Sequence, residues 1–289
     1  MLRSFVNLLR KSGKFQVGFG ILGFFVLIAI FNQPLTELIG HGHNPLELDA
    51  YQPWLIPSLR HPLGTDRYGR DILAMTITGL VASLEIGAIA GIISTVIGVV
   101  VAFVGGYKGG TLDGVLATTT DVFLVVPSFP LLLTLSAYVQ NINLLEISLI
   151  LSIFSWPFAA RTIRAQVLSL RSRPYVELAK VTNLSDGEII FQELVPNLAP
   201  YIGVGLASAA LGAIFALVGL EVIGLGPSGL LDLGLMINFA ISWGAMTLGA
   251  WPLFVAPVVV LALLFTAVNL INIGLEEVYN PRLRSTAGA

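Results

Sequence analysis

Residues 80–104 read LVASLEIGAIAGIISTVIGVVVAFV, and this stretch decides the class of the protein. Its one charged residue is Glu85, and its length exceeds the roughly 20 apolar residues that a membrane-spanning helix needs. Because the bilayer interior offers no water to backbone N–H and C=O groups, a spanning run must be helical. The stretch therefore predicts an α-helical membrane protein.

Five further apolar runs surround this one, at residues 15–31, 115–139, 144–160, 198–220 and 251–273. The sequence therefore predicts an all-α polytopic membrane protein with six transmembrane helices. Pro127 and Pro130 interrupt the third helix in sequence order, and proline inside a helix removes a hydrogen bond and introduces a kink.

The composition excludes several other classes of protein. Charged residues make up 11% of the 289 residues, against about 25% in soluble domains, and the mean hydropathy is +0.87. A soluble enzyme would need a better solvated surface. The net charge of -2 gives no reason to expect nucleic-acid binding, and the absence of cysteine excludes disulfides and thiolate metal sites.

The basic residues predict the orientation in the membrane, since inner loops carry an excess of Lys and Arg. With a cytoplasmic N-terminus, the inner segments hold 12 of the 15 basic residues and the outer segments hold three, Arg60, Arg67 and Arg70. Both termini are therefore expected in the cytoplasm. The expected organisation is a tail, first span and outer loop at 1–79, a permease core at 80–284 containing an inner loop at 161–197, and a short tail at 285–289.

The predicted spans contain three acidic residues, Glu85, Asp121 and Glu146, and each lies nearer a span end than the bilayer midplane. An ion-coupled transporter usually needs ionisable groups or broken helices at the midplane. These three residues are therefore expected at the interfaces or between helices, and a stand-alone secondary transporter or channel is disfavoured.

Small residues form stripes at helical spacing on two spans, which lets helix backbones approach closely. Either packing within this chain or contact with a second membrane subunit would explain them. The stripes consist of Gly87, Gly91, Ser94 and Gly98 on the second span and of Gly205, Ala209, Gly212, Ala216 and Gly219 on the fifth.

The inner segment 171–197, RSRPYVELAKVTNLSDGEIIFQELVPN, has the signals of two short helices. Pro174 suits the first turn of a helix that runs to about Thr182. Asn183 tolerates the left-handed conformation that ends a helix. Ser185 and Glu188 form a capping box for a second helix, which Pro196 is expected to close. Such a pair could be a docking surface for a soluble partner or an ordinary connector.

The outer segment 61–71 reads HPLGTDRYGRD and alternates charge at Asp66, Arg67, Arg70 and Asp71. Two interpretations stand open, a local salt-bridged cap on the second span and a contact with a substrate-delivering protein or outer gate. Upstream, His41 and His43 could ligate a metal, although loop histidines at this spacing are more often solvated.

The segment from Glu177 to Asn197 resembles the EAA coupling motif of ABC importer permeases, approximately EAAxxxGASDxxIIFxHxLPN in the peptide branch. It aligns without a gap, and the departures from the motif include Leu178, Asn183 and Glu193. Matching positions are Glu177, Ala179, Ser185, Asp186, Ile189, Ile190, Phe191, Pro196 and Asn197.

Three further segments resemble the second permease of dipeptide and oligopeptide importers. They are the outer motif 61–71, with Gly64, Asp66, Gly69, Arg70 and Asp71, the inner loop GYKGGTLD at 106–113, and the ending NPRLR at 280–284.

This resemblance implies the type I ABC importer permease fold and a role in moving di- or oligopeptides across the cytoplasmic membrane. Relatives that carry oligosaccharides or another small solute make that cargo the alternative. The implied partners are a sister permease, two cytoplasmic ATPase subunits, an extracytoplasmic substrate-binding protein and membrane lipid.

The resemblance also implies that the chain holds no cofactor, with ATP and Mg on the ATPase subunits. A Walker A loop would need GxxxxGK[ST], and the one Gly-Lys pair, Gly13-Lys14, is followed by Phe15. A membrane-embedded enzyme is disfavoured because no catalytic cluster is visible, and Gly226-Pro-Ser-Gly-Leu230 fails the GxSxG pattern.

Overall fold

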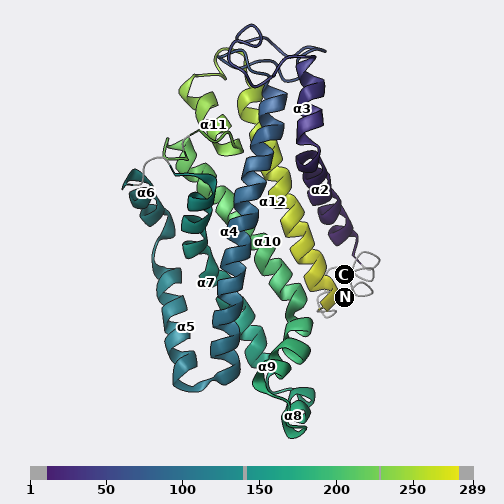
Figure 1. The fold of residues 1–289 in the computed structure, drawn as a ribbon, viewed down its shortest axis with the longest axis vertical. Coiled ribbons are helices and arrows are strands. Elements are labelled where there is room, and N and C mark those ends of the chain that lie inside the picture. The colour runs from purple at the N-terminus through teal and green to yellow at the C-terminus, as the bar shows by residue number, and fades with distance from the viewer. Residues whose placement is uncertain (1–11, 139–141, 228, 280–289) are drawn as a thin grey trace, which may run out of the picture. The chain divides into compact units, whose positions relative to one another are not determined.

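The computed structural model describes residues 12–138, 142–227 and 229–279, and its elements are almost entirely α-helical (Figure 1). In chain order these are α2 (Gly13–Ile30), α3 (Asn32–Gly40), α4 (Ile72–Lys108), α5 (Gly110–Val125), α6 (Ser128–Tyr138), α7 (Leu144–Leu170), α8 (Pro174–Val181), α9 (Asp186–Glu188), the π-helix η1 (Ile189–Leu194), α10 (Val195–Val222), α11 (Leu233–Ser242) and α12 (Pro252–Tyr279).

The all-α membrane class is confirmed. Within the described ranges, five helices are long and apolar enough to cross a bilayer, and a sixth span is complete if the bent pair α5–α6 counts as one. The exposed side chains suit lipid contact, because α2 presents Phe24, Leu27 and Ile30 outward and α4 presents Val96 and Val100.

The predicted kink in the third span is confirmed as a break. Helices α5 and α6 meet at an angle of 73°. Val126 takes the extended conformation (φ −66°, ψ 126°) because the ring of the following proline, Pro127, disfavours the helical region for the residue before it.

Three boundaries differ from the sequence prediction. Helix α4 begins at Ile72 rather than near residue 80, and α11 forms inside the outer segment expected to be loop. Helix α7 continues ten residues beyond Ala160, so that Arg161 and Arg164 are helical. Their charges had marked the start of a loop, but both residues pair with aspartates of α5, which allows the helix to continue.

The chain divides into two compact units. Unit 1 comprises residues 1–85, 140–144 and 217–289, and unit 2 comprises residues 86–139 and 145–216. In unit 1, α2 packs along α12 at two glycines. A Cβ at Gly18 would overlap the carbonyl of Ala267, and a Cβ at Gly274 would lie 2.7 Å from Phe15. Lys14 and Glu277 close this helix pair with an ion pair of 2.5 Å.

The outer motif 61–71 folds in unit 1 as a cap at the start of α4, with Asp66 at its centre. The Asp66 carboxylate is fully buried and accepts hydrogen bonds from the backbone N–H groups of Tyr68 (2.8 Å) and Arg70 (2.9 Å), and from Nε of Arg70 (2.7 Å). Three of the roughly four acceptor sites of the carboxylate are thus used inside the motif.

The remaining motif residues complete this cap. Asp71 caps α4 by accepting from Leu73 N–H at 2.8 Å, and its other oxygen lies 2.8 Å from Nδ1 of the buried His61. Gly64 (φ +79°) and Gly69 (φ +72°) have left-handed backbones, and a Cβ at either would overlap a backbone carbonyl. The geometry thus supports the salt-bridged-cap interpretation for these residues.

In unit 2, the small-residue stripe of α4 packs within the chain. A Cβ at Gly91 would lie 2.8 Å from the Cβ of Ala210 on α10, and one at Gly98 would lie 2.9 Å from the backbone nitrogen of Ala160 on α7. Between these glycines, Ser94 Oγ donates to the carbonyl of Ser152 on α7 at 3.1 Å. The stripe sets the close approach of three helices of one subunit.

Candidate functional site

The first short helix of the inner segment forms as predicted. Helix α8 begins at Pro174, which lacks the N–H that would have no partner in a first turn, and ends at Val181. Asn183 then takes the left-handed conformation with φ 64°. Asparagine tolerates this conformation better than other residues with a Cβ, so the chain reverses at the expected position.

The second short helix differs from the prediction. Ser185 and Glu188 form the expected capping box, in which Ser185 Oγ accepts from Glu188 N–H while the Glu188 carboxylate accepts from Ser185 N–H at 2.8 Å. However, Pro196 does not close the helix. Helix α9 passes into η1 and η1 into α10, where Pro196 is the second residue, a first-turn position at which its missing N–H costs little.

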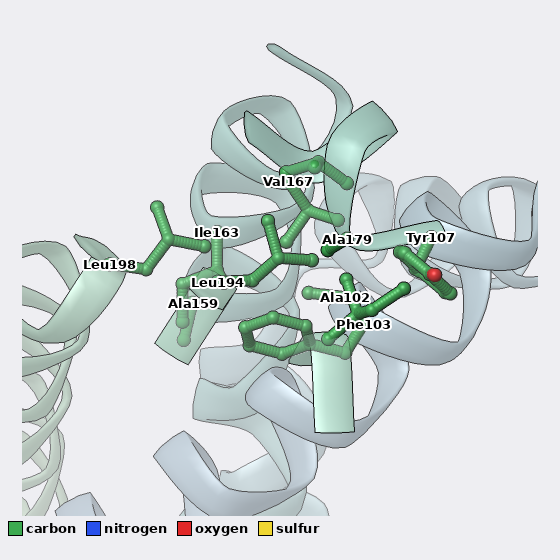
Figure 2. Packing of buried hydrophobic residues seen from close by; sticks show 11 residues of the cluster. Ala102, Phe103, Tyr107, Ala159, Ile163, Val167, Ala179, Leu194 and Leu198 are labelled. Carbon is green, nitrogen blue, oxygen red and sulfur yellow. The ribbon is translucent and has the colours of Figure 1, made fainter. Parts of the chain in front are cut away.

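An apolar cluster holds this segment against the spanning helices of unit 2. Figure 2 shows its side chains turned toward one another from α4, α7, α8, η1 and α10. The members are Ala102, Phe103, Tyr107, Ala159, Ile163, Val167, Val176, Ala179, Ile189, Leu194 and Leu198. The segment 171–197 is called the coupling segment below. Its motif residues Ala179 and Ile189 are buried in this cluster, so they attach the segment to the spanning helices.

Polar contacts tie the inner loop 106–113 to the same segment. The Tyr107 hydroxyl donates to Asp186 Oδ1 at 3.1 Å, and Lys180 Nζ lies 5.5 Å from the centre of the Tyr107 ring. Arg171 Nη1 donates to the carbonyl of Gly106 at 2.8 Å. The sequence presented the loop and the coupling segment as two separate motifs, but the structure makes them one site.

A bidentate ion pair fixes the adjoining helices α5 and α7. Arg164 donates from Nε to Asp113 Oδ1 at 2.6 Å and from Nη2 to Asp113 Oδ2 at 2.8 Å. Bidentate geometry makes this a strong and directional contact. Asp113 is the last residue of the inner-loop motif, so the motif holds α8 at one end and α7 at the other.

The outward surface of the coupling segment is apolar with an acidic residue. The exposed fractions are 64% for Leu178, 83% for Val181 and 74% for Phe191. Glu177 is exposed beside them on α8. Tyr175 is also exposed on this segment, and burial of its hydroxyl and the charge of Glu193 raise the pKa of that hydroxyl. An apolar surface of this kind at an inner membrane face indicates a protein partner.

The other predicted site residues fall at different places. Ser185, Pro196 and Asn183 are exposed on the coupling segment. On α10, Gly205 and Ala209 are buried, Ala216 is half-buried, and Gly212 is exposed with open space around its Cα. Residues 280–284, which carry the C-terminal motif, lie outside the described residues.

Sequence reasoning missed a buried pair of carboxyl groups in unit 1, Glu221 at the end of α10 and Asp232 at the start of α11. Asp232 caps α11 by accepting from Gly234 N–H at 2.8 Å and Leu235 N–H at 2.9 Å. Burial raises the pKa of the Asp232 carboxyl. A Cβ at Gly226 would overlap the Glu221 side chain. A glycine at this position was therefore the sequence feature that could have indicated a buried side chain beside it.

The outer histidines do not gather a metal site. His41 and His43 are exposed, whereas His61 is buried against Asp71. Among the residues with described positions, no group of three or more His, Asp or Glu side chains is placed to hold a metal ion.

Comparison with known proteins gives one family and several relatives. Residues 94–285 match the family described as binding-protein-dependent transport system inner membrane component. The oligopeptide transport system permease protein OppC of Mycobacterium tuberculosis (strain H37Rv) is 32% identical over 264 residues, covering 90% of this chain and 88% of the relative. A probable peptide ABC transporter permease protein, y4tQ of Sinorhizobium fredii, is 33% identical over 280 residues, covering 96% and 92%.

The bond between Tyr107 and Asp186 predicts how firmly the coupling segment is held. Replacing Tyr107 with Phe keeps the packed ring and removes one hydrogen bond worth about 1 kcal/mol, so amides of residues 184–190 should exchange hydrogen about fivefold faster. Hydrogen-exchange mass spectrometry of the protein in lipid nanodiscs measures this rate. Tyr138→Phe, at an exposed tyrosine of α6, is the matched control. Equal rates in both variants would show that the hydroxyl contributes nothing.

Proposed function

Because the chain belongs to the family of binding-protein-dependent transport system inner membrane components, we propose that it is the membrane-spanning permease subunit of an ATP-driven importer of di- or oligopeptides. The cargo class follows from the relatives, since those from Mycobacterium tuberculosis and Sinorhizobium fredii carry oligopeptide or peptide permease names. Oligosaccharides remain the alternative cargo.

The observation that carries the proposal is the coupling segment. It exposes Glu177, Leu178 and Phe191 while its other face is buried against the spans. A permease without a nucleotide-binding loop must receive the energy of ATP hydrolysis mechanically, through contact with an ATPase subunit. An apolar knob with one carboxylate suits a groove that is apolar with a basic residue.

The contacts inside unit 2 suggest how that energy reaches the spans. The segment is attached to α4 through Tyr107 and to α7 through the apolar cluster, and it continues into α10 through η1. Movement of a docked ATPase would therefore displace three spanning helices together. Asp186 acts here as a tether to α4 rather than as a docking contact.

The complete importer contains two cytoplasmic ATPase subunits, an extracytoplasmic binding protein and a sister permease. ATP and Mg²⁺ would be bound by the ATPase subunits, and the cytoplasmic membrane is the location. The family description supports the binding protein, since it names dependence on one, and the ATPase subunits and sister permease are proposed from the motif resemblance.

We predict that Glu177→Arg weakens binding of the ATPase subunit by about 5- to 150-fold, because a desolvated ion pair of about 1 to 3 kcal/mol is replaced by repulsion. In the same experiment, Asn183→Val should lower substrate-stimulated ATP hydrolysis, since a β-branched residue is strained at φ 64°. Pull-down and ATPase assays of the full complex measure the two effects.

Glu37→Arg is the matched control for Glu177→Arg, because it makes the same charge change at an exposed position of α3 in the outer segment. It should leave ATPase binding unchanged. The coupling assignment fails if Glu177→Arg and Asn183→Val both support hydrolysis and import at the wild-type rate.

We also propose that both termini are cytoplasmic, because the basic residues favour the inner segments by 10 to 3 even when Arg161 and Arg164 of α7 are left out of the 12. The chain has no cysteine, so single cysteines report orientation directly. Asn44→Cys should react with an impermeant thiol reagent in intact cells, and Ser185→Cys only after permeabilisation. Both residues are exposed. The reverse pattern would invert the topology.

The sister permease is proposed to contact the exposed part of the α10 stripe at Gly212. A leucine there meets no atom of this chain within 4 Å of the added Cβ, so Gly212→Leu should leave folding intact and weaken co-purification of the sister subunit. Gly203→Leu is the matched control, since Gly203 also lies on α10 with open space, nine residues away on the opposite face. Loss of folding in place of loss of pairing would contradict this contact.

A further inference from the structure

Unit 2 carries an exposed ion pair within its spanning helices. Arg161 Nη1 on α7 lies 3.7 Å from Asp121 Oδ1 on α5, and the two side chains are 69% and 62% exposed. The neighbouring pair Arg164–Asp113 is different, because it is bidentate at 2.6 and 2.8 Å and its side chains are 30% and 15% exposed. Both pairs link α5 to α7. The Arg164–Asp113 pair is closed and directional, whereas the Arg161–Asp121 pair is longer and more exposed.

Contacts within unit 2 give the depth of this pair in the bilayer. Helix α4 has no charged residue from Ile86 to Tyr107, a stretch of about 33 Å that matches the thickness of the hydrocarbon core. Gly98 lies near the middle of that stretch and packs against the backbone nitrogen of Ala160. Arg161 is the next residue, so the ion pair lies within the depth of this apolar stretch rather than beyond either of its ends.

A charge at this depth is costly in contact with lipid and is almost always directed at protein or water. The exposed face of α4 at the same level is different in kind, since it presents Ile92, Val96 and Val100. The two outward surfaces of unit 2 therefore suit different surroundings, with lipid against α4 and a polar medium against the ion pair.

The polar character extends along α5. Thr111, Gly114, Thr118 and Asp121 are all exposed and follow a spacing of three, four and three residues, which places them on one face of the helix. Exposed valines adjoin this polar face, with Val115 and Val122 at its edge and Val125 one turn beyond Asp121. On α7, Ala165 is exposed one turn beyond Arg161 and is equally small.

We propose that this face of α5 and α7 lines the water-filled path of the cargo, and that Asp121 and Arg161 contact the charged ends of a passing peptide. This inference rests on the proposed function. A free peptide carries an ammonium group at one end and a carboxylate at the other, which complements one carboxylate and one guanidinium. Because Asp121 and Arg161 are loosely paired, each can release the other and bind an end of the peptide, and no packed contact has to open.

The first test is water access, measured on single-cysteine variants of the complete complex in nanodiscs. The thiolate form of cysteine attacks a methanethiosulfonate reagent and displaces its sulfinate group. The thiolate forms in water and is suppressed in apolar surroundings. Thr118→Cys should therefore react at least about tenfold faster than Val100→Cys, an exposed control on α4 between the levels of Gly98 and Gly105, which contact α7 and α5. Equal, slow reaction of both variants would place the α5 face against lipid and overturn the proposal.

A contact with the sister permease would give a different result. Thr118→Cys would then react in the isolated chain and be protected in the assembled complex, which also overturns the proposal. If the face lines the path, reaction in the complex continues and saturating peptide with binding protein slows it.

The second test is the double variant Asp121→Asn with Arg161→Gln, which keeps both polar shapes and removes both charges together. Peptide import should fall about tenfold, as expected for loss of charge-assisted contacts, while assembly with the ATPase subunits stays at the wild-type level. Import at the wild-type rate would overturn the role in cargo contact. Failure of the wild-type complex to import any peptide would instead refute the proposed function, whatever the labelling of Thr118→Cys shows.

Discussion

A charge inside a bilayer must be paired, protonated or directed at water, and this constraint explains the placement of the chain's ionisable groups. Arg164 and Asp113 satisfy it by a closed bidentate pair that joins α5 to α7. Glu221 and Asp232 are buried in unit 1, and burial raises the pKa of the Asp232 carboxyl. Arg161 and Asp121 pair loosely and remain open on one side. The degree of closure separates the groups that hold helices together from those available to cargo.

The coupling segment derives its rigidity from residues outside its own motif. Its helices α8 and α9 are too short to be stable alone, because isolated helices of fewer than about 12 residues are marginal in water. They are held by the apolar cluster, by the Tyr107–Asp186 hydrogen bond and by the Arg171 contact to the carbonyl of Gly106. A knob that transmits force needs such attachment, since a flexible connector would absorb the movement of the ATPase.

Local signals in the sequence predicted what local physics controls. The 73° break before Pro127, the start of α8 at Pro174, the left-handed Asn183 and the capping box at Ser185 each depend on a few neighbouring residues. The partners of charged side chains depend on tertiary packing, so the sequence showed Arg161 and Arg164 as the start of a loop and Asp121 as a residue near a span end. In the structure both arginines lie on the continuous helix α7, where they pair with aspartates of α5.

The π-helix η1 was not predicted from the sequence, and its position gives it a mechanical role. Six residues, Ile189–Leu194, replace the turn that Pro196 was expected to impose. A π segment adds a residue per turn and changes the direction in which side chains leave the helix. Here Ile189 and Leu194 both point into the buried cluster while Phe191 is exposed. The segment therefore presents its docking surface outward and continues unbroken into α10, which makes the second coupling helix one rod with a spanning helix.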